Sequence, residues 1–141
     1  MDRGDILRMW LPLAAGLFAV CVAFLSGPGS RDTLRWIGFA LALIGLAGVI
    51  LARYTLGRSF SISPKAKGLV TRGIYSRIRN PIYVFSTILV AGIFLMIRNP
   101  YLWLILGALV CIQSIRARRE ARVLEAAFGE AYREYRKRTW F

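Results

Sequence analysis

Long apolar runs alternate with short basic segments along this chain of 141 residues. The apolar runs cover residues 9–25, 36–56, 82–97 and 101–115. A helix that crosses the hydrocarbon core of a bilayer needs about 20 residues, within a range of about 17–25. The first two runs meet that length. The last two are short and either reach it by borrowing flanking residues, which we favour, or form a tight hairpin that does not fully cross the bilayer. We therefore expect about four membrane-spanning helices.

A different pattern begins after the fourth run. Residues 116–135 are mostly polar, but Glu120, Leu124 and Phe128 recur every four residues and so share one face of a helix. Gly129 then breaks the pattern. Glu120 lies closest to the membrane on this apolar face and should have a partner, because an unpaired carboxylate is costly there. The whole pattern predicts an all-α fold, a polytopic membrane protein with about four transmembrane helices and a cytoplasmic C-terminal helix.

The positive charges fall mainly on one side of this predicted arrangement. The chain is 57% hydrophobic with a formal charge of +13. Two of its 20 Lys and Arg residues lie in the N-terminal tail, seven between Arg53 and Arg79, and eight in the C-terminal tail, and four spans put these 17 on one side. Cytoplasmic segments carry the excess of Lys and Arg. We expect a single integral membrane domain over 1–141 with both termini in the cytoplasm.

Several function classes are disfavoured by composition. Cationic segments beside membrane spans contact anionic lipid headgroups, and no nucleic-acid motif accompanies them, so membrane lipids and not nucleic acid are the expected partners. Cys21 and Cys111 lie inside apolar runs and make no disulfide framework or metal pattern. The absence of histidine excludes His-based zinc sites and triads. All seven acids lie outside the apolar runs, which argues against a small transporter with a membrane-embedded carboxylate.

The segment before the third run is too long and too rich in aromatic and β-branched residues for a plain connector. Asn80 precedes Pro81, a pair typical of the cap and first turn of a helix. Arg79 fits contact with lipid headgroups, and Tyr75 and Tyr83 fit anchoring at the membrane interface. The residues alone do not decide between these structural roles and a functional role for the segment.

Two motifs in this part of the chain resemble a known family. The stretch Gly73-x-Tyr75-x-x-x-Arg79-Asn80-Pro81-x-Tyr83 is followed by Glu120-x-x-x-Leu124-x-x-x-Phe128-Gly129-x-x-Tyr132-x-x-Tyr135. Separated by one hydrophobic hairpin, they resemble the isoprenylcysteine carboxyl methyltransferase family, which is related to the membrane phospholipid methyltransferases. The resemblance implies a compact helical membrane enzyme that uses S-adenosylmethionine. Segments 68–83 and 116–135 would enclose this cofactor at the cytoplasmic face.

The resemblance also implies roles for the matching residues. Glu120 would pair with the ammonium group or a ribose hydroxyl of the cofactor, and Arg79 with a carboxylate of the cofactor or the substrate. Asn80 would supply hydrogen bonds beside them. These three form the expected catalytic set. The expected cofactor-binding set comprises Gly73, Tyr75, Arg79, Asn80, Pro81, Tyr83, Glu120 and Leu124, with the tyrosines as aromatic walls and the glycine permitting close backbone approach.

Two positions depart from the family's common pattern. Asn80 stands where histidine is commonest, and an amide does not titrate near neutral pH, so Asn80 is not a general base. Ala121 follows Glu120 where the family often has a second glutamate. We expect methyl transfer to a lipidic or prenylated small molecule, most like carboxyl O-methylation. N-methylation of a phospholipid or other lipid amine, and an inactive member acting as a membrane binding protein, stay open as alternatives.

Overall fold

The structure is a computed structural model that describes residues 3–25, 32–56 and 69–141. These residues form α1 (Arg3–Leu25), α2 (Thr33–Leu56), a short 3-10 helix η2 (Gly73–Ser76), α3 (Pro81–Ile97) and α4 (Leu102–Arg138). They contain no strand beyond an isolated parallel bridge between Ile78 and Trp140. The predicted all-α fold is confirmed for this part of the chain. Gly68, where the first predicted cofactor segment begins, lies outside the described residues.

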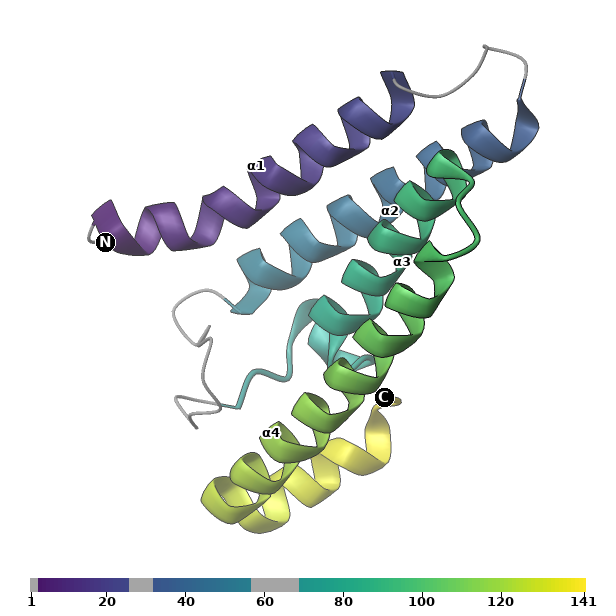
Figure 1. Ribbon diagram of the computed structural model, residues 1–141. Coiled ribbons are helices and arrows are strands. Elements are labelled where there is room, and N and C mark those ends of the chain that lie inside the picture. The colour runs from purple at the N-terminus through teal and green to yellow at the C-terminus, as the bar shows by residue number, and fades with distance from the viewer. Residues whose placement is uncertain (1–2, 26–31, 57–68) are drawn as a thin grey trace.

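The helices form an up-and-down bundle whose polar segments gather at one end (Figure 1). Helix α2 runs antiparallel to both α1 and α3 and contacts both. Helix α4 starts beside the end of α3 and extends past the opposite end of the bundle. The start of α1, the end of α2, η2, the start of α3 and the second half of α4 therefore lie at the same end. This end carries both sequence motifs.

Glycine allows α2 and α3 to pack with their backbones in close approach. A side-chain carbon on Gly92 would lie 2.5 Å from both the Ala42 nitrogen and the Gly38 carbonyl oxygen, and one on Gly45 would collide with the Leu89 backbone. Small residues serve this purpose at helix interfaces in membranes, where close packing replaces the hydrophobic effect. The buried core beside this contact consists of Leu13, Val20, Ala23, Ala42, Leu46, Val49 and Met96.

The outer surface of the bundle is apolar. In the described residues one helix, α2, is long and apolar enough to cross a membrane by length and composition, with a mean hydropathy of 2.1. The helical stretches Leu11–Leu25 and Pro81–Ile97 are apolar but shorter. Large apolar side chains are exposed on the outside of α1, α2 and the first half of α4, including Phe18 and Leu104. Exposed apolar surface of this extent marks a membrane or protein contact. The count of four spans stays a prediction.

The predicted fourth span and the predicted C-terminal helix form one element, α4, which continues through residues 115 and 116. The residues on either side of this point are mainly alanine, arginine, isoleucine and glutamate, and nothing there interrupts the helix. The break comes at Gly129, as its place in the sequence pattern indicates. Its φ of 50° and ψ of −119° form a combination open essentially to glycine. The last turns of α4 fold back there toward η2 (Figure 1).

Candidate functional site

The segment before α3 and the end of the chain are joined by backbone hydrogen bonds. The Trp140 N–H donates to the Arg77 carbonyl at 3.0 Å, and the Arg79 N–H donates to the Trp140 carbonyl at 3.3 Å. The Asn80 N–H donates to the Phe141 carbonyl at 3.0 Å. Such N–H groups just ahead of a helix lack partners within it. The returning tail satisfies them and thereby fixes the backbone of Arg79 and Asn80.

A side-chain hydrogen bond joins the two motifs as well. The Tyr83 hydroxyl, in the first turn of α3, donates to Oε1 of Glu120 on α4 at 2.6 Å. Both side chains are half-buried. The distance is in the range of O–H donors to ionised carboxylates. Tyr83 is thus the hydrogen-bond partner that we expected for Glu120. Its hydroxyl orients the Glu120 carboxylate.

Three tyrosines form an aromatic wall beside this pair. The Tyr135 hydroxyl donates to the Tyr75 carbonyl at 2.7 Å, which ties the folded-back end of α4 to η2. The Tyr132 and Tyr135 ring centroids lie 6.2 Å apart. Tyr75 is 7% exposed and Tyr132 is 3% exposed, so both are anchored among neighbours. The turn at Gly129 is what brings Tyr132 and Tyr135 to the first motif.

The charges of Arg79 and Glu120 both reach this aromatic wall. Burial raises the pKa of Tyr132, the charge of Arg79 opposes this rise, and the charge of Glu120 adds to it. Burial also raises the pKa of Tyr75, with further contributions from Tyr135 and Glu120. The guanidinium and the carboxylate therefore lie within electrostatic reach of the same rings. The structure brings the two motifs to one place.

Two donors at this place are open to a ligand. Asn80 stands at the N-cap of α3, yet its side chain makes no capping hydrogen bond. Among the ion pairs of the described residues, none involves the Arg79 guanidinium. Both side chains are half-buried, and Pro81 beside them is fully buried at the start of the helix. A guanidinium and an amide so placed can bind a carboxylate or hydroxyl oxygens.

The remaining predicted residues lie at the edges of this site. Gly73 begins η2 with a φ of +59°, and a side-chain carbon there would lie 3.1 Å from the Thr55 methyl group of α2. Its close neighbour in the structure is thus α2. Leu124 is half-buried, four residues after Glu120 on the same helical face.

Sequence reasoning missed a polar cluster deeper in the bundle. The amide of Gln113 on α4 donates from Nε2 to the Ser86 hydroxyl at 3.1 Å and accepts at Oε1 from the Thr87 hydroxyl at 2.8 Å. Both hydroxyls belong to α3. All three residues fall inside or next to apolar runs, where their polarity is easily overlooked. The signal available was the single amide near the end of the fourth run.

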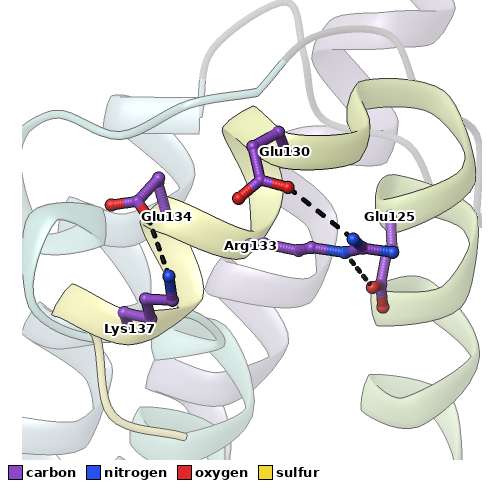
Figure 2. Close-up of polar contacts among 5 residues, drawn as sticks. All are labelled: Glu125, Glu130, Arg133, Glu134 and Lys137. Atoms are coloured by element: carbon purple, nitrogen blue, oxygen red, sulfur yellow. Dashed lines mark hydrogen bonds and ion pairs between the residues drawn. The ribbon is translucent and has the colours of Figure 1, made fainter.

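Ion pairs hold the turn at Gly129 from outside (Figure 2). Arg133 donates to Glu125 across the turn at 2.9 Å and lies 3.6 Å from Glu130. This contact raises the pKa of Arg133. In the last turns Lys137 pairs with Glu134 at 2.9 Å and lowers the pKa of that carboxyl. Exposed pairs of this kind each contribute little, so the conformation depends chiefly on Gly129 itself.

The Tyr135 contact has a testable dependence on pH. Burial and the neighbouring Tyr132 raise the pKa of Tyr135 from its ordinary value of 10.0 to about 12. Between these values the unfolded chain loses the phenolic proton while the folded protein keeps it, so the free energy of unfolding falls as the pH rises. We expect Tyr135→Phe to flatten this fall in thermal unfolding in detergent between pH 9 and about pH 11.5. An unchanged pH dependence would show that Tyr135 is not held as described.

An all-helical bundle with an apolar exterior and a polar, arginine-containing site at one end is typical of helical membrane proteins. A sequence profile of the family described as phospholipid methyltransferase matches residues 33–131, from the start of α2 to just beyond the turn at Gly129. The chain belongs to this family, which is part of the group of membrane methyltransferases that includes the isoprenylcysteine carboxyl methyltransferases. The resemblance seen in the sequence motifs is confirmed.

A curated relative is the nickel-cobalt-cadmium resistance protein NccN of Alcaligenes xylosoxydans xylosoxydans, which is 32% identical over 125 residues. The alignment covers 85% of this chain but 57% of that protein, so the chain spans little more than half the length of this relative. No solved structure matches the chain.

Proposed function

We propose that this protein transfers a methyl group from S-adenosylmethionine to an amphiphilic substrate at the cytoplasmic face of a membrane. The observation that carries the proposal is the hydrogen bond from Tyr83 to Glu120, because it joins the two motifs into one site. The family supplies the reaction class, methyl transfer. The site supplies one oriented carboxylate, open donors on Arg79 and Asn80, and aromatic rings.

The residues of this site fit the cofactor that the family generally uses. Glu120 is placed to accept hydrogen bonds from an ammonium group or ribose hydroxyls, and the open donors of Arg79 and Asn80 suit a carboxylate. The half-buried ring of Tyr83, beside Glu120, suits a cationic sulfonium. When bound, S-adenosylmethionine supplies a methyl group that is already activated by the sulfonium charge. The task left to these residues is to align the reacting groups and exclude water.

For the substrate we favour a lipidic carboxylate, as in isoprenylcysteine carboxyl O-methylation. Three guanidinium groups, those of Arg53, Arg79 and Arg136, act on Tyr75 and Tyr132, against the two carboxylates of Glu120 and Glu125. This balance favours an anionic head over an ammonium. A carboxylate nucleophile also needs no general base, which agrees with the amide at Asn80. An amphiphile would reach these residues sideways from the lipid, with its apolar part against the exposed apolar exterior.

N-methylation of a phospholipid or another lipid amine is the second candidate, and the description of the matching family favours it. An ammonium group must lose a proton before its nitrogen can attack the methyl group, and it would have to rely on Glu120 or on water to take this proton. Asn80 is compatible with this reaction because its amide can position an amine without titrating.

We also propose the membrane arrangement expected from the sequence, with four spans and both termini in the cytoplasm. The up-and-down order of the helices supports it, because it puts η2 and the second half of α4 at one end (Figure 1). The basic residues of these segments, including Arg77 and Arg118, are exposed there and suit anionic headgroups.

The name of the curated relative links that protein to nickel, cobalt and cadmium resistance. Among the described residues no three His, Cys, Asp or Glu side chains come together in a way that could hold a metal ion. If a role in resistance is shared, we propose that it acts through methylation of a membrane component.

The proposal is tested by identifying which lipid acquires a methyl group. Membranes from cells that express the protein, and matched membranes that lack it, are incubated with S-adenosylmethionine labelled in the methyl group, and their lipids are extracted. We expect label in lipid only where the protein is present, and we expect mild base to release it as methanol, as a methyl ester requires. Label that survives mild base would show that the substrate is a lipid amine and not a carboxylate. Equal label in the two membranes, with purified protein giving no turnover on the extracted lipids, would reject the proposal.

A further inference from the structure

The polar cluster of Ser86, Thr87 and Gln113 lies between α3 and α4, within the apolar runs of both helices. No water reaches the hydrocarbon region of a membrane, so polar side chains there must satisfy one another. Gln113 does so by bonding to both hydroxyls, at 3.1 Å to Ser86 and 2.8 Å to Thr87. It is buried, with 9% of its surface exposed. A single amide thus connects the two helices.

The same two hydroxyls meet the backbone of Tyr83. Ser86 Oγ lies 3.1 Å and Thr87 Oγ1 lies 2.9 Å from the Tyr83 carbonyl oxygen. Each hydroxyl carries one hydrogen, so Thr87 must share it between the Tyr83 carbonyl and Gln113. Ser86 can give its hydrogen to the carbonyl while it accepts from Gln113. The amide therefore determines how the first turn of α3 is hydrogen-bonded.

Gln113 and Glu120 lie on the same face of α4, so the hydrogen bonds of Gln113 also influence the position of Glu120. Gln113, Ala117, Glu120 and Leu124 follow one another at helical spacing along one face, and the first two are buried. Glu120 follows Gln113 by seven positions, about 10.5 Å along the helix axis. A second crosslink at this distance fixes both the rotation and the axial position of α4 against α3. Glu120 then faces the Tyr83 hydroxyl.

We propose that Gln113, through Ser86 and Thr87, is a positioning residue that holds the pair Tyr83–Glu120 in register. The consequence for cofactor affinity rests on the proposed function, whereas the positioning itself does not. Hydrogen bonds between helices in membranes are individually modest. The loss of this one should misalign Glu120 without unfolding the bundle.

The first test is a double-mutant cycle on the affinity for S-adenosylmethionine, measured by calorimetry in detergent. Gln113→Met keeps the length of the side chain and removes its hydrogen bonds. We expect this change to raise the Kd about tenfold in the parent and less than about twofold in a Tyr83→Phe background, because the pair is already broken there. Ser114→Ala is the matched control. The Ser114 hydroxyl donates to the Val110 carbonyl of its own helix at 2.8 Å and bonds to no other helix of the described residues, so this change should leave the Kd unchanged.

The second test does not depend on the cofactor. Amide hydrogen exchange of the first turn of α3 should speed up in Gln113→Met and stay at the parental rate in Ser114→Ala. If the parent binds no S-adenosylmethionine but shows this exchange pattern, the proposed function fails and the positioning role stands. Unchanged exchange in Gln113→Met would overturn the positioning role, and so would equal effects of Gln113→Met on the Kd in both backgrounds.

Discussion

Glu120→Gln is expected to weaken the binding of S-adenosylmethionine by about 10- to 100-fold. Hydrogen bonds to a charged group contribute about 1.5–3 kcal/mol, and the glutamine loses this charge while it keeps the shape of the side chain. The Tyr83 hydroxyl, which now donates to the carboxylate at 2.6 Å, would meet a neutral amide. We expect a loss of similar size for Arg79→Ala because its guanidinium is open to a ligand carboxylate. Calorimetry of purified protein in detergent measures both.

The matched control for this prediction is Glu134→Gln. Glu134 lies on the same tail and pairs with Lys137 at 2.9 Å, but its side chain is exposed and takes no part in the contacts between the two motifs. This variant should bind the cofactor as the parent does. Equal affinities for the parent, Glu120→Gln and Arg79→Ala would show that the site lies elsewhere.

Gly129→Ala is expected to lower both thermal stability and methyl transfer. At a φ of 50° and a ψ of −119° a side chain strains the backbone, at a cost of about 1–3 kcal/mol. Apart from its chain neighbours and the nearby backbone of its own helix, no atom of the described residues lies within 4 Å of the added carbon, so the effect would come from backbone conformation and not from a collision. Relaxing the strain straightens α4 and carries Tyr132 and Tyr135 away from η2. Thermal unfolding and activity in detergent measure the two losses.

Gly107 offers a control for this substitution in the same helix. An added carbon there would also be clear of all more distant atoms in the described part of the chain, but the φ of Gly107 is not in the left-handed region. Gly107→Ala should leave activity unchanged and should raise stability slightly, because alanine favours the helix. If Gly129→Ala behaves like Gly107→Ala, the folded-back tail is not what completes the site.

Much of the fold follows from local patterns in the sequence. The apolar runs predict the helices because a run of this length fits a helix that lies in an apolar environment. Pro81 predicts the start of α3 because its fixed φ suits the first position of a helix. The apolar pattern did not predict that the fourth run and the amphipathic tail form one continuous helix. A change in polarity indicates a change of environment, while the backbone continues wherever helix-forming residues allow it. Only Gly129 supplies a conformational reason to stop.

The sequence predicted which residues belong to the candidate site better than it predicted the contacts between them. The two motifs identify Arg79, Asn80 and Glu120, but the partner of Glu120 is on another helix, 37 positions away. The backbone bonds from Trp140 to Arg77 and Arg79 have no periodic signature, since they form between segments far apart in the chain. Such contacts depend on the turn at Gly129 and on helix packing. Local sequence patterns do not encode them.

The central claim is that the segment before α3 and the tail of α4 together bind S-adenosylmethionine. Ultraviolet cross-linking of the labelled cofactor to the purified protein, followed by peptide mapping, tests this claim most directly. We predict label in peptides from both 69–83 and 116–135, and an excess of unlabelled cofactor should abolish it. Label confined to other helices, or label that survives the excess, would contradict the account.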